Sequence, residues 1–407
     1  MENLIVDRRG LALAHNRRVV RVLAGDAAAT LADQVLVFVL LQALVLARDG
    51  AAFILAALMA ADYLPGLALG PLCGAVLDRF GGRNWPLALN LAKALMALAL
   101  ALMIGLEANH MVLLVVYFLG RSAGQAYLVS RLTLFPALVK ESELLHLNTL
   151  AARVSLIMRA IGPPLAGAAA GAWGPRPSLV LSAVLLMLAG LILGPGPESP
   201  RAAITPAKTM ALSAALKKGL AVLSRRPGLR RVFGLLTLII LGGGLVNFCA
   251  PLLAAERLAE TGPGIFWLGL MTGAFNLGSI AATFGVDRFK GKGEGLIFRL
   301  SAGLCGPACL ALILAQGGPG LTTGFLVFGL VSQPGLVILS AWIQGQAPVE
   351  VRGRVLALAS SLQAGGYLVA SFIGAGLQSL GGLELLLVLA GILMACAALP
   401  SPPALDK

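Results

Sequence analysis

The chain has 407 residues, of which 58% are hydrophobic and only 12% are charged. A soluble globule of this size needs far more polar side chains to cover its surface, so the composition excludes a soluble enzyme or binding domain. The formal net charge of +13 leaves two explanations open, which are a nucleic-acid partner and a membrane protein with basic loops.

The apolar segments are continuous over about 20 residues, the length that a helix needs to cross a bilayer. Strands of a membrane barrel alternate in polarity over about 10 residues instead. The sequence therefore predicts an all-α integral membrane protein with twelve transmembrane helices. The predicted spans are 19–47, 51–77, 86–106, 111–130, 148–171, 178–195, 232–253, 265–286, 296–315, 321–342, 355–379 and 383–400.

A short charged motif occurs at corresponding points of the two halves of the chain. Asp78-Arg79-Phe80 and Asp287-Arg288-Phe289 each follow one apolar span and precede the next. Such an internal repeat predicts two pseudo-symmetric six-helix bundles. The longest polar stretch lies between the sixth and seventh spans, so the predicted domains are an N-terminal bundle at 1–195, a cytoplasmic linker at 196–231 and a C-terminal bundle at 232–407.

The basic residues follow the predicted topology. With a cytoplasmic N-terminus, most Lys and Arg residues lie on the cytoplasmic side, and only Arg48, Arg176 and Arg257 lie outside. This bias predicts that both termini are cytoplasmic, and it explains the net charge through contact with anionic lipids rather than nucleic acid. The predicted location is the bacterial cytoplasmic (inner) membrane.

The loop between the second and third spans resembles a signature of the major facilitator superfamily, G-x-x-x-D-R-x-G-R-R. It supplies Gly74, Asp78, Arg79, Gly81 and Arg83, and it departs from the pattern at Gly82, where the family often has a basic residue. The resemblance implies the major facilitator fold over essentially the whole chain.

Within this superfamily, the chain looks closest to the drug-efflux group that includes macrolide and siderophore exporters. Three stretches carry this likeness, at 135–148, at Gly162-Pro163 and at 348–355. Asp33 in the first span and Asn90-x-x-Lys93 in the third also look like the bacterial lysophospholipid transporters of the same superfamily.

The resemblance implies a conformational latch made by the charged cytoplasmic loops. A carboxylate at the end of the second helix would meet the N-terminus and basic residues of the eleventh helix, and would tie the halves together when the cavity opens outward. The alternative is that the basic residues of these loops only determine topology. The latch residues are Gly74, Asp78, Arg79, Arg83, Asp287, Arg288, Glu350, Arg352 and Arg354.

Charged residues within the spans are concentrated in the first half of the chain. A central charge that faces lipid costs roughly 2.5 to 3.5 kcal/mol, so these groups must face the protein interior. They either form a static cluster of salt bridges or carry the proton and substrate pathway, because a pair that breaks and reforms can couple binding to a conformational change. The pathway candidates are Asp33, Asp62, Lys93, Arg121 and Arg159, whereas Asp26 and Arg153 are interpreted as structural.

The second half offers uncharged amides and aromatic residues instead, which suit an amphipathic substrate. The alternative for each is that it holds helices together. The candidates are Asn247, Asn276, Gln333, Trp342, Gln363 and Tyr367. Small residues at i, i+4 spacing predict close helix packing at Gly162, Pro163, Gly167, Gly366 and Gly374.

No nucleotide-binding glycine loop, catalytic triad or cluster of His and Cys residues is evident, so the sequence predicts no enzyme activity, cofactor or metal. The favoured function is a monomeric secondary active transporter that exports an amphipathic small molecule by alternating access, coupled to a proton or another ion. The first alternative is a lysophospholipid transporter, and the second is a non-transporting receptor or assembly protein.

Overall fold

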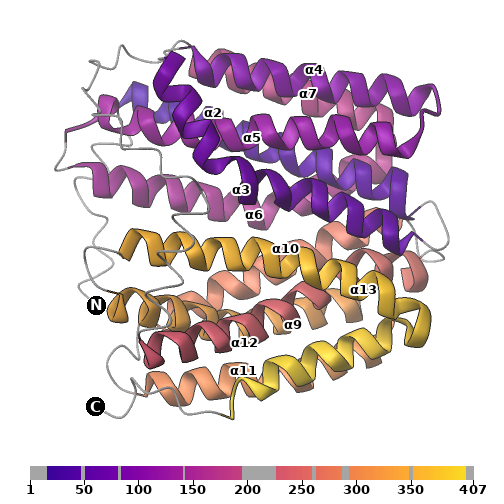
Figure 1. The fold of residues 1–407 in the computed structure, drawn as a ribbon. Helices are drawn as coiled ribbons and strands as arrows, with labels where there is room; N and C mark the ends of the chain where they lie inside the picture. Colours follow the sequence, from indigo (N-terminus) through magenta and orange to yellow (C-terminus); the bar gives the residue numbers. More distant parts are fainter. Residues whose placement is uncertain are drawn as a thin grey trace. The chain divides into compact units, whose positions relative to one another are not determined.

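The structure is a computed structural model that describes residues 16–46, 51–80, 84–140, 143–194, 226–258, 263–286, 293–347 and 352–399. Its regular elements in these ranges are helices (Figure 1). Eleven of them are long and apolar enough to cross a membrane.

In the described ranges of the first half, the structure has six long helices, and short polar or glycine-containing segments separate them. Asn16 and Asn109 cap two of the helices, because their side chains accept hydrogen bonds from the backbone N–H groups of Arg18 and Met111. Gly174 separates the last two helices with φ of 77°, a conformation that favours glycine. The elements are α2 (Arg17–Leu41) with the π-helix η2 (Gln42–Leu46), α3 (Ala52–Phe80), α4 (Trp85–Gly105), α5 (His110–Leu138), α6 (Leu144–Trp173) and α7 (Pro175–Leu193).

The second half contains α9 (Pro227–Leu258), α10 (Gly264–Val286), α11 (Glu294–Leu314), α12 (Gly317–Gln346) and α13 (Arg352–Cys396). The backbone of α13 is not helical at Gly381 and Gly382, and Gly382 has φ of 67°. This break lies between the predicted spans 355–379 and 383–400, so α13 contains both of them. Each of the other predicted spans corresponds to one helix.

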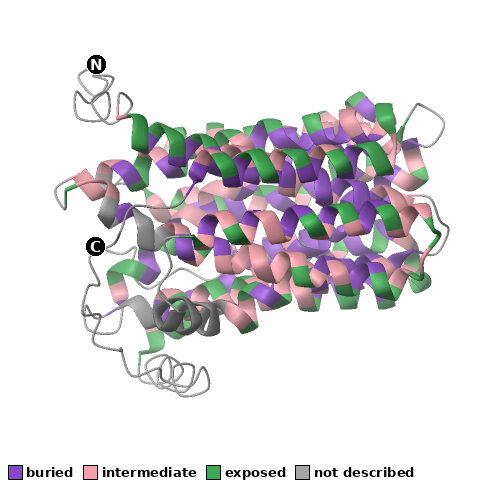
Figure 2. Ribbon diagram, turned by 90° about the horizontal axis from the view of Figure 1, so that it is seen from above, coloured by how far each residue is buried: buried purple, intermediate pink, exposed green. Residues whose placement is uncertain are grey.

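The two halves use corresponding helix pairs. The first helix, α2, packs against α6 and α7, and its counterpart α9 packs against α13, which holds the corresponding two spans. The third helix, α4, packs against α5 and α7, and its counterpart α11 packs against α12 and α13. Exposed Leu, Val and Ile side chains alternate with buried ones along individual helices (Figure 2), as expected for helices that face lipid on one side.

The packing divides the chain into two compact units, which we call unit 1 (1–43 and 68–209) and unit 2 (44–67 and 210–407). The first part of α3 therefore packs with unit 2, while the rest of this helix belongs to unit 1. The predicted boundaries at 195 and 232 remain a prediction.

Candidate functional site

Unit 1 contains an ion pair between two of the predicted pathway residues. The Nζ atom of Lys93 on α4 lies 2.8 Å from Oδ1 and 2.9 Å from Oδ2 of Asp33 on α2. The Lys93 side chain is only 5% exposed, whereas that of Asp33 is 27% exposed. Of the predicted pathway cations, Lys93 is thus the one that pairs with Asp33, and the carboxylate is the more accessible member of the pair.

A second ion pair lies on the same face of α2, two turns earlier. Arg131 on α5 pairs with Asp26, whose side chain is 5% exposed. Tyr127 connects the two pairs, because its hydroxyl donates a 3.4 Å hydrogen bond to Asp26 and its ring centre lies 5.6 Å from the Lys93 ammonium. Two acids and two bases are therefore neutralised in pairs around one tyrosine.

The other three charged candidates of the first half have separate places in the structure. Asp62 on α3 and Arg121 on α5 are half-buried, and Arg159 on α6 is exposed. Each of the three interacts with a neighbouring group.

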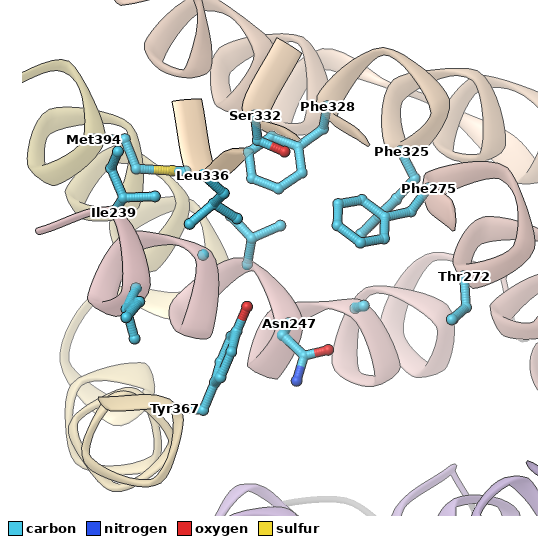
Figure 3. A pocket seen from close by; sticks show the side chains of 14 residues that line it. Ile239, Asn247, Thr272, Phe275, Phe325, Phe328, Ser332, Leu336, Tyr367 and Met394 are labelled. Atoms are coloured by element: carbon cyan, nitrogen blue, oxygen red, sulfur yellow. The ribbon is translucent and has the colours of Figure 1, made fainter. Parts of the chain in front are cut away.

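Unit 2 contains a largely apolar pocket with a volume of about 630 Å³, which includes its open mouth (Figure 3). Three phenylalanine rings and several aliphatic side chains line it, and its polar groups are one amide, two aliphatic hydroxyls and one phenol. The lining residues are Ile239, Ile240, Gly243, Val246, Asn247, Ala250, Thr272, Phe275, Phe325, Phe328, Ser332, Leu336, Tyr367 and Met394.

Two of the predicted pathway residues, Asn247 on α9 and Tyr367 on α13, line this pocket. Tyr63 of α3, which also belongs to unit 2, contacts both. Its hydroxyl accepts a 3.2 Å hydrogen bond from Nδ2 of Asn247, and its ring stacks on that of Tyr367 with the centres 5.6 Å apart. These contacts fix the orientation of the two side chains at the pocket.

The four remaining candidates of the second half are not among the lining residues. Trp342 is buried against α11, where it donates a 3.2 Å hydrogen bond to Glu294 and packs on the ring of Phe298. Asn276 donates to the backbone oxygen of Thr272 in its own helix. Gln333 is half-buried on α12, and Gln363 is exposed on α13.

The predicted small residues lie at helix contacts. A Cβ atom on Gly366 would collide with Ile240, and one on Gly374 would lie 2.6 Å from the ring of Phe248. Gly162 faces Gln34 of α2 in the same way, and Pro163 and Gly167 are buried on α6. Larger residues at Gly366 and Gly374 would force the paired helices α9 and α13 to shift, whereas at Gly162 the flexible side chain of Gln34 would have to move.

Four of the nine predicted latch residues lie outside the described part of the chain. This holds for Arg83, Asp287, Arg288 and Glu350. Three more positions lie on α3 and two on the first turn of α13, but their side chains are also outside the described set; these are Gly74, Asp78, Arg79, Arg352 and Arg354. The latch remains a prediction.

The sequence interpretation missed two features of the site. The charge bias alone places Arg131 on the cytoplasmic side and gives it no partner. The spacing of the residues could have indicated one, because Asp26 and Asp33 are two helical turns apart and Tyr127 and Arg131 are one turn apart, so the members of each pair share a helix face. The phenylalanines of the pocket were also missed, because Phe residues in a membrane helix look alike whether they face lipid or a cavity. Within the ranges that the structure covers, no three His, Cys, Asp or Glu residues form a potential metal site.

Comparisons with known proteins identify the family of this chain. Residues 27–371 match the model of the Major Facilitator Superfamily. An uncharacterized MFS-type transporter, y4rN of Sinorhizobium fredii (strain NBRC 101917 / NGR234), is 28% identical over 358 residues, which are 84% of this chain and 85% of that protein.

Solved transporter structures share the fold at low sequence identity. The nucleoside transporter NupG superposes with a TM-score of 0.73 at 12% identity, over 94% of this chain and 97% of that one. A POT family transporter in complex with 5-aminolevulinic acid gives a TM-score of 0.71 at 12% identity, over 97% of each chain. These superpositions confirm the all-helical major facilitator fold. Because the family model matches most of its length, the chain belongs to the Major Facilitator Superfamily as a multi-pass secondary transporter, and it is not an enzyme.

Proposed function

We propose that this protein exports amphipathic small molecules across the bacterial cytoplasmic membrane in exchange for protons, with both termini in the cytoplasm. The observation that carries the proposal is the ion pair between Asp33 and Lys93, in which a buried ammonium depends on a partly accessible carboxylate. The bacterial origin of the related y4rN protein supports the location.

The geometry supports a coupling role for Asp33 because the carboxylate can be reached while its partner is enclosed. Protonation of Asp33 removes the negative charge that stabilises Lys93, so the buried ammonium must find another partner or move toward water. The ring of Tyr127, 5.6 Å away, can stabilise this cation through its π face. Binding of a proton thus changes the relative stability of two arrangements of α2 and α4, which is what coupling requires.

The pocket of unit 2 supports the amphipathic character of the substrate. Its lining is mostly apolar, and its few polar groups are uncharged. A site of this composition gains binding energy from buried apolar area and obtains orientation from a small number of hydrogen bonds. The charged residues of unit 1 and the apolar pocket of unit 2 would then divide coupling and substrate binding between the two units.

The proposal is tested with purified protein reconstituted into liposomes. A thermal-shift screen against lysolipids, siderophores and amphipathic drugs first finds a compound that stabilises the folded protein by mass action. Transport of that compound is then measured with and without an imposed pH gradient, for the unchanged protein and for Asp33→Asn. We expect the gradient to drive uphill transport only in the unchanged protein, because the amide keeps a hydrogen bond but cannot exchange a proton.

Binding should separate coupling from folding. We expect Asp33→Asn to bind the compound within about tenfold of the unchanged protein, a difference of about 1.4 kcal/mol. Gradient-driven uptake by a well-folded Asp33→Asn protein would contradict proton coupling through this residue. Stabilisation by lysolipids alone would favour the lysophospholipid alternative.

A further inference from the structure

The pocket of unit 2 has a lining that fits a flat, uncharged ring system. The planes of the Phe275 and Phe328 rings are inclined by 28° with their centres 6.0 Å apart, and Phe325 also lines the pocket (Figure 3). None of the lining residues carries a charge at neutral pH, so the pocket offers no counterion to a carboxylate or an ammonium of a ligand. A charged group would lose its hydration there without gaining an ion pair, whereas an aromatic ring would find ring faces to stack on.

The pocket also presents a free hydrogen-bond acceptor. Asn247 makes its contacts with Met59 and Tyr63 through Nδ2. The amide carbonyl oxygen Oδ1 therefore remains available to a donor in the pocket. By contrast, the hydroxyl of Thr272 already donates a 2.9 Å hydrogen bond to the backbone oxygen of Leu268.

Ser332 supplies a second polar group. The residue is only 5% exposed, and its hydroxyl forms no hydrogen bond with any residue that the structure describes. Nearby Ser340 on the same helix satisfies its hydroxyl with the backbone oxygen four residues earlier. A hydroxyl that lines a pocket and forms no bond within its own helix can donate a hydrogen bond to a ligand there.

The backbone of α12 near this serine is bonded by a side chain of the neighbouring helix α11. Ser301 of α11 accepts a 2.9 Å hydrogen bond from the backbone N–H of Gly335 and donates to the backbone oxygen of Val331. A serine hydroxyl thus bridges these two backbone groups, next to Pro334, which has no N–H to donate. The bridged turn contains Ser332.

Taken with the proposed function, on which this inference rests, these contacts identify the part of the substrate that unit 2 binds. We infer that the pocket binds an uncharged aromatic ring system that carries a hydroxyl or a comparable group. The rings stack against Phe275, Phe325 and Phe328. The hydroxyl accepts a hydrogen bond from the hydroxyl of Ser332, and Oδ1 of Asn247 accepts from a second donor where the substrate carries one. Any charged group of the substrate lies outside this pocket.

The test uses three probes of the same ring size, which are 2-naphthol, 2-naphthoate and a trimethylammonium derivative of naphthalene. The melting temperature of the purified full-length protein in detergent is measured against the concentration of each probe at neutral pH. We expect 2-naphthol to raise the melting temperature, and the anion and the cation to have little effect at equal concentration. Equal stabilisation by either charged probe overturns the inference.

Two substitutions test whether 2-naphthol binds in the pocket. Ser332→Ala removes one hydrogen bond and is expected to weaken 2-naphthol binding about fivefold. Phe325→Leu keeps the apolar volume but removes a stacking face, with a similar expected effect. The matched controls are Ser340→Ala, whose hydroxyl bonds within its own helix, and Phe372→Leu, whose ring is exposed on α13; both should bind as the unchanged protein does.

The result of the binding test does not depend on proton coupling, because binding is measured without a pH gradient. If 2-naphthol binds in a Ser332-dependent and Phe325-dependent manner but no gradient drives uptake, the pocket assignment holds and the proposed function fails. If both variants bind 2-naphthol as tightly as their controls do, the pocket assignment is wrong, whatever the transport assay shows. The melting temperature of each variant without probe shows that it is folded.

Discussion

At the scale of single residues, the carboxylates of the two ion pairs of unit 1 differ in their exposed fraction. The Asp26 side chain is 5% exposed and its partner Arg131 is 14% exposed, whereas Asp33 is 27% exposed. A group that exchanges protons needs a route to water, and a group that only holds helices together does not. The structure therefore points to different consequences for the loss of each carboxylate.

We expect Asp26→Asn to reduce stability more than Asp33→Asn does. Removing one member of a buried ion pair leaves an uncompensated charge and typically costs about 3 to 5 kcal/mol. The loss at Asp33 should be smaller, because this pair is nearer to solvent and Lys93 keeps its contact with the Tyr127 ring. Melting temperatures of the purified variants check the order.

The double variant Asp26→Asn with Arg131→Gln tests the reason for this loss. It removes both charges and should recover much of the stability, since the cost comes from the unpaired cation. A double variant no more stable than Asp26→Asn alone would show that Asp26 acts through Tyr127 or the packing of α2 instead of through Arg131.

At the scale of elements, one turn of α12 is bridged by a side chain of the neighbouring helix α11. The hydroxyl of Ser301 satisfies one backbone donor and one backbone acceptor of α12 at once. Its side chain also fills the space next to Gly335, where a Cβ atom would lie 2.9 Å from the Ser301 oxygen. Only glycine at 335 permits this close approach.

We expect Ser301→Ala to destabilise the protein by about 1 to 3 kcal/mol, because two buried backbone groups lose their partner. The matched control is Ser371→Ala, which removes a buried hydroxyl that bonds only to Tyr367 of its own helix. Amide hydrogen exchange at Gly335 reports the change directly, and it should become faster in Ser301→Ala. Unchanged exchange together with an unchanged melting temperature would mean that the turn closes on itself without cost.

Sequence patterns predicted the elements well because hydropathy reports the length of each span directly. The break at Gly381 and Gly382 fell between two predicted spans, since two glycines interrupt the apolar run. The site was predicted less completely. Asp33 and Lys93 lie within predicted spans, so their charge identified them as interior residues. Arg131 lies just beyond the predicted span 111–130 and looks like a loop residue, although the helix continues to Leu138 and Arg131 pairs with Asp26 of another helix.

At the scale of the whole molecule, the sequence repeat predicted two similar halves, and corresponding helix pairs in both halves agree with it. The repeat could not predict that residues 44–67 group with unit 2. Which neighbours an apolar segment packs against depends on shape, and hydropathy does not record shape.

This grouping leads to a prediction for a protein that is cut between Pro200 and Pro206. The fragment before the cut contains residues 44–67, whose packing partners in unit 2 lie in the fragment after it. We expect the two co-expressed fragments to co-purify and to bind the stabilising compound, because the packed pairs α2–α7 and α9–α13 each remain within one fragment. The first fragment expressed alone should give less folded protein.

A cut after Ala160 in α6 serves as the control, since it severs a helix that packs on α2, and it should prevent assembly. Folded fragments that fail to co-purify after the first cut would show that the packing of residues 44–67 in unit 2 is too weak to hold the protein together.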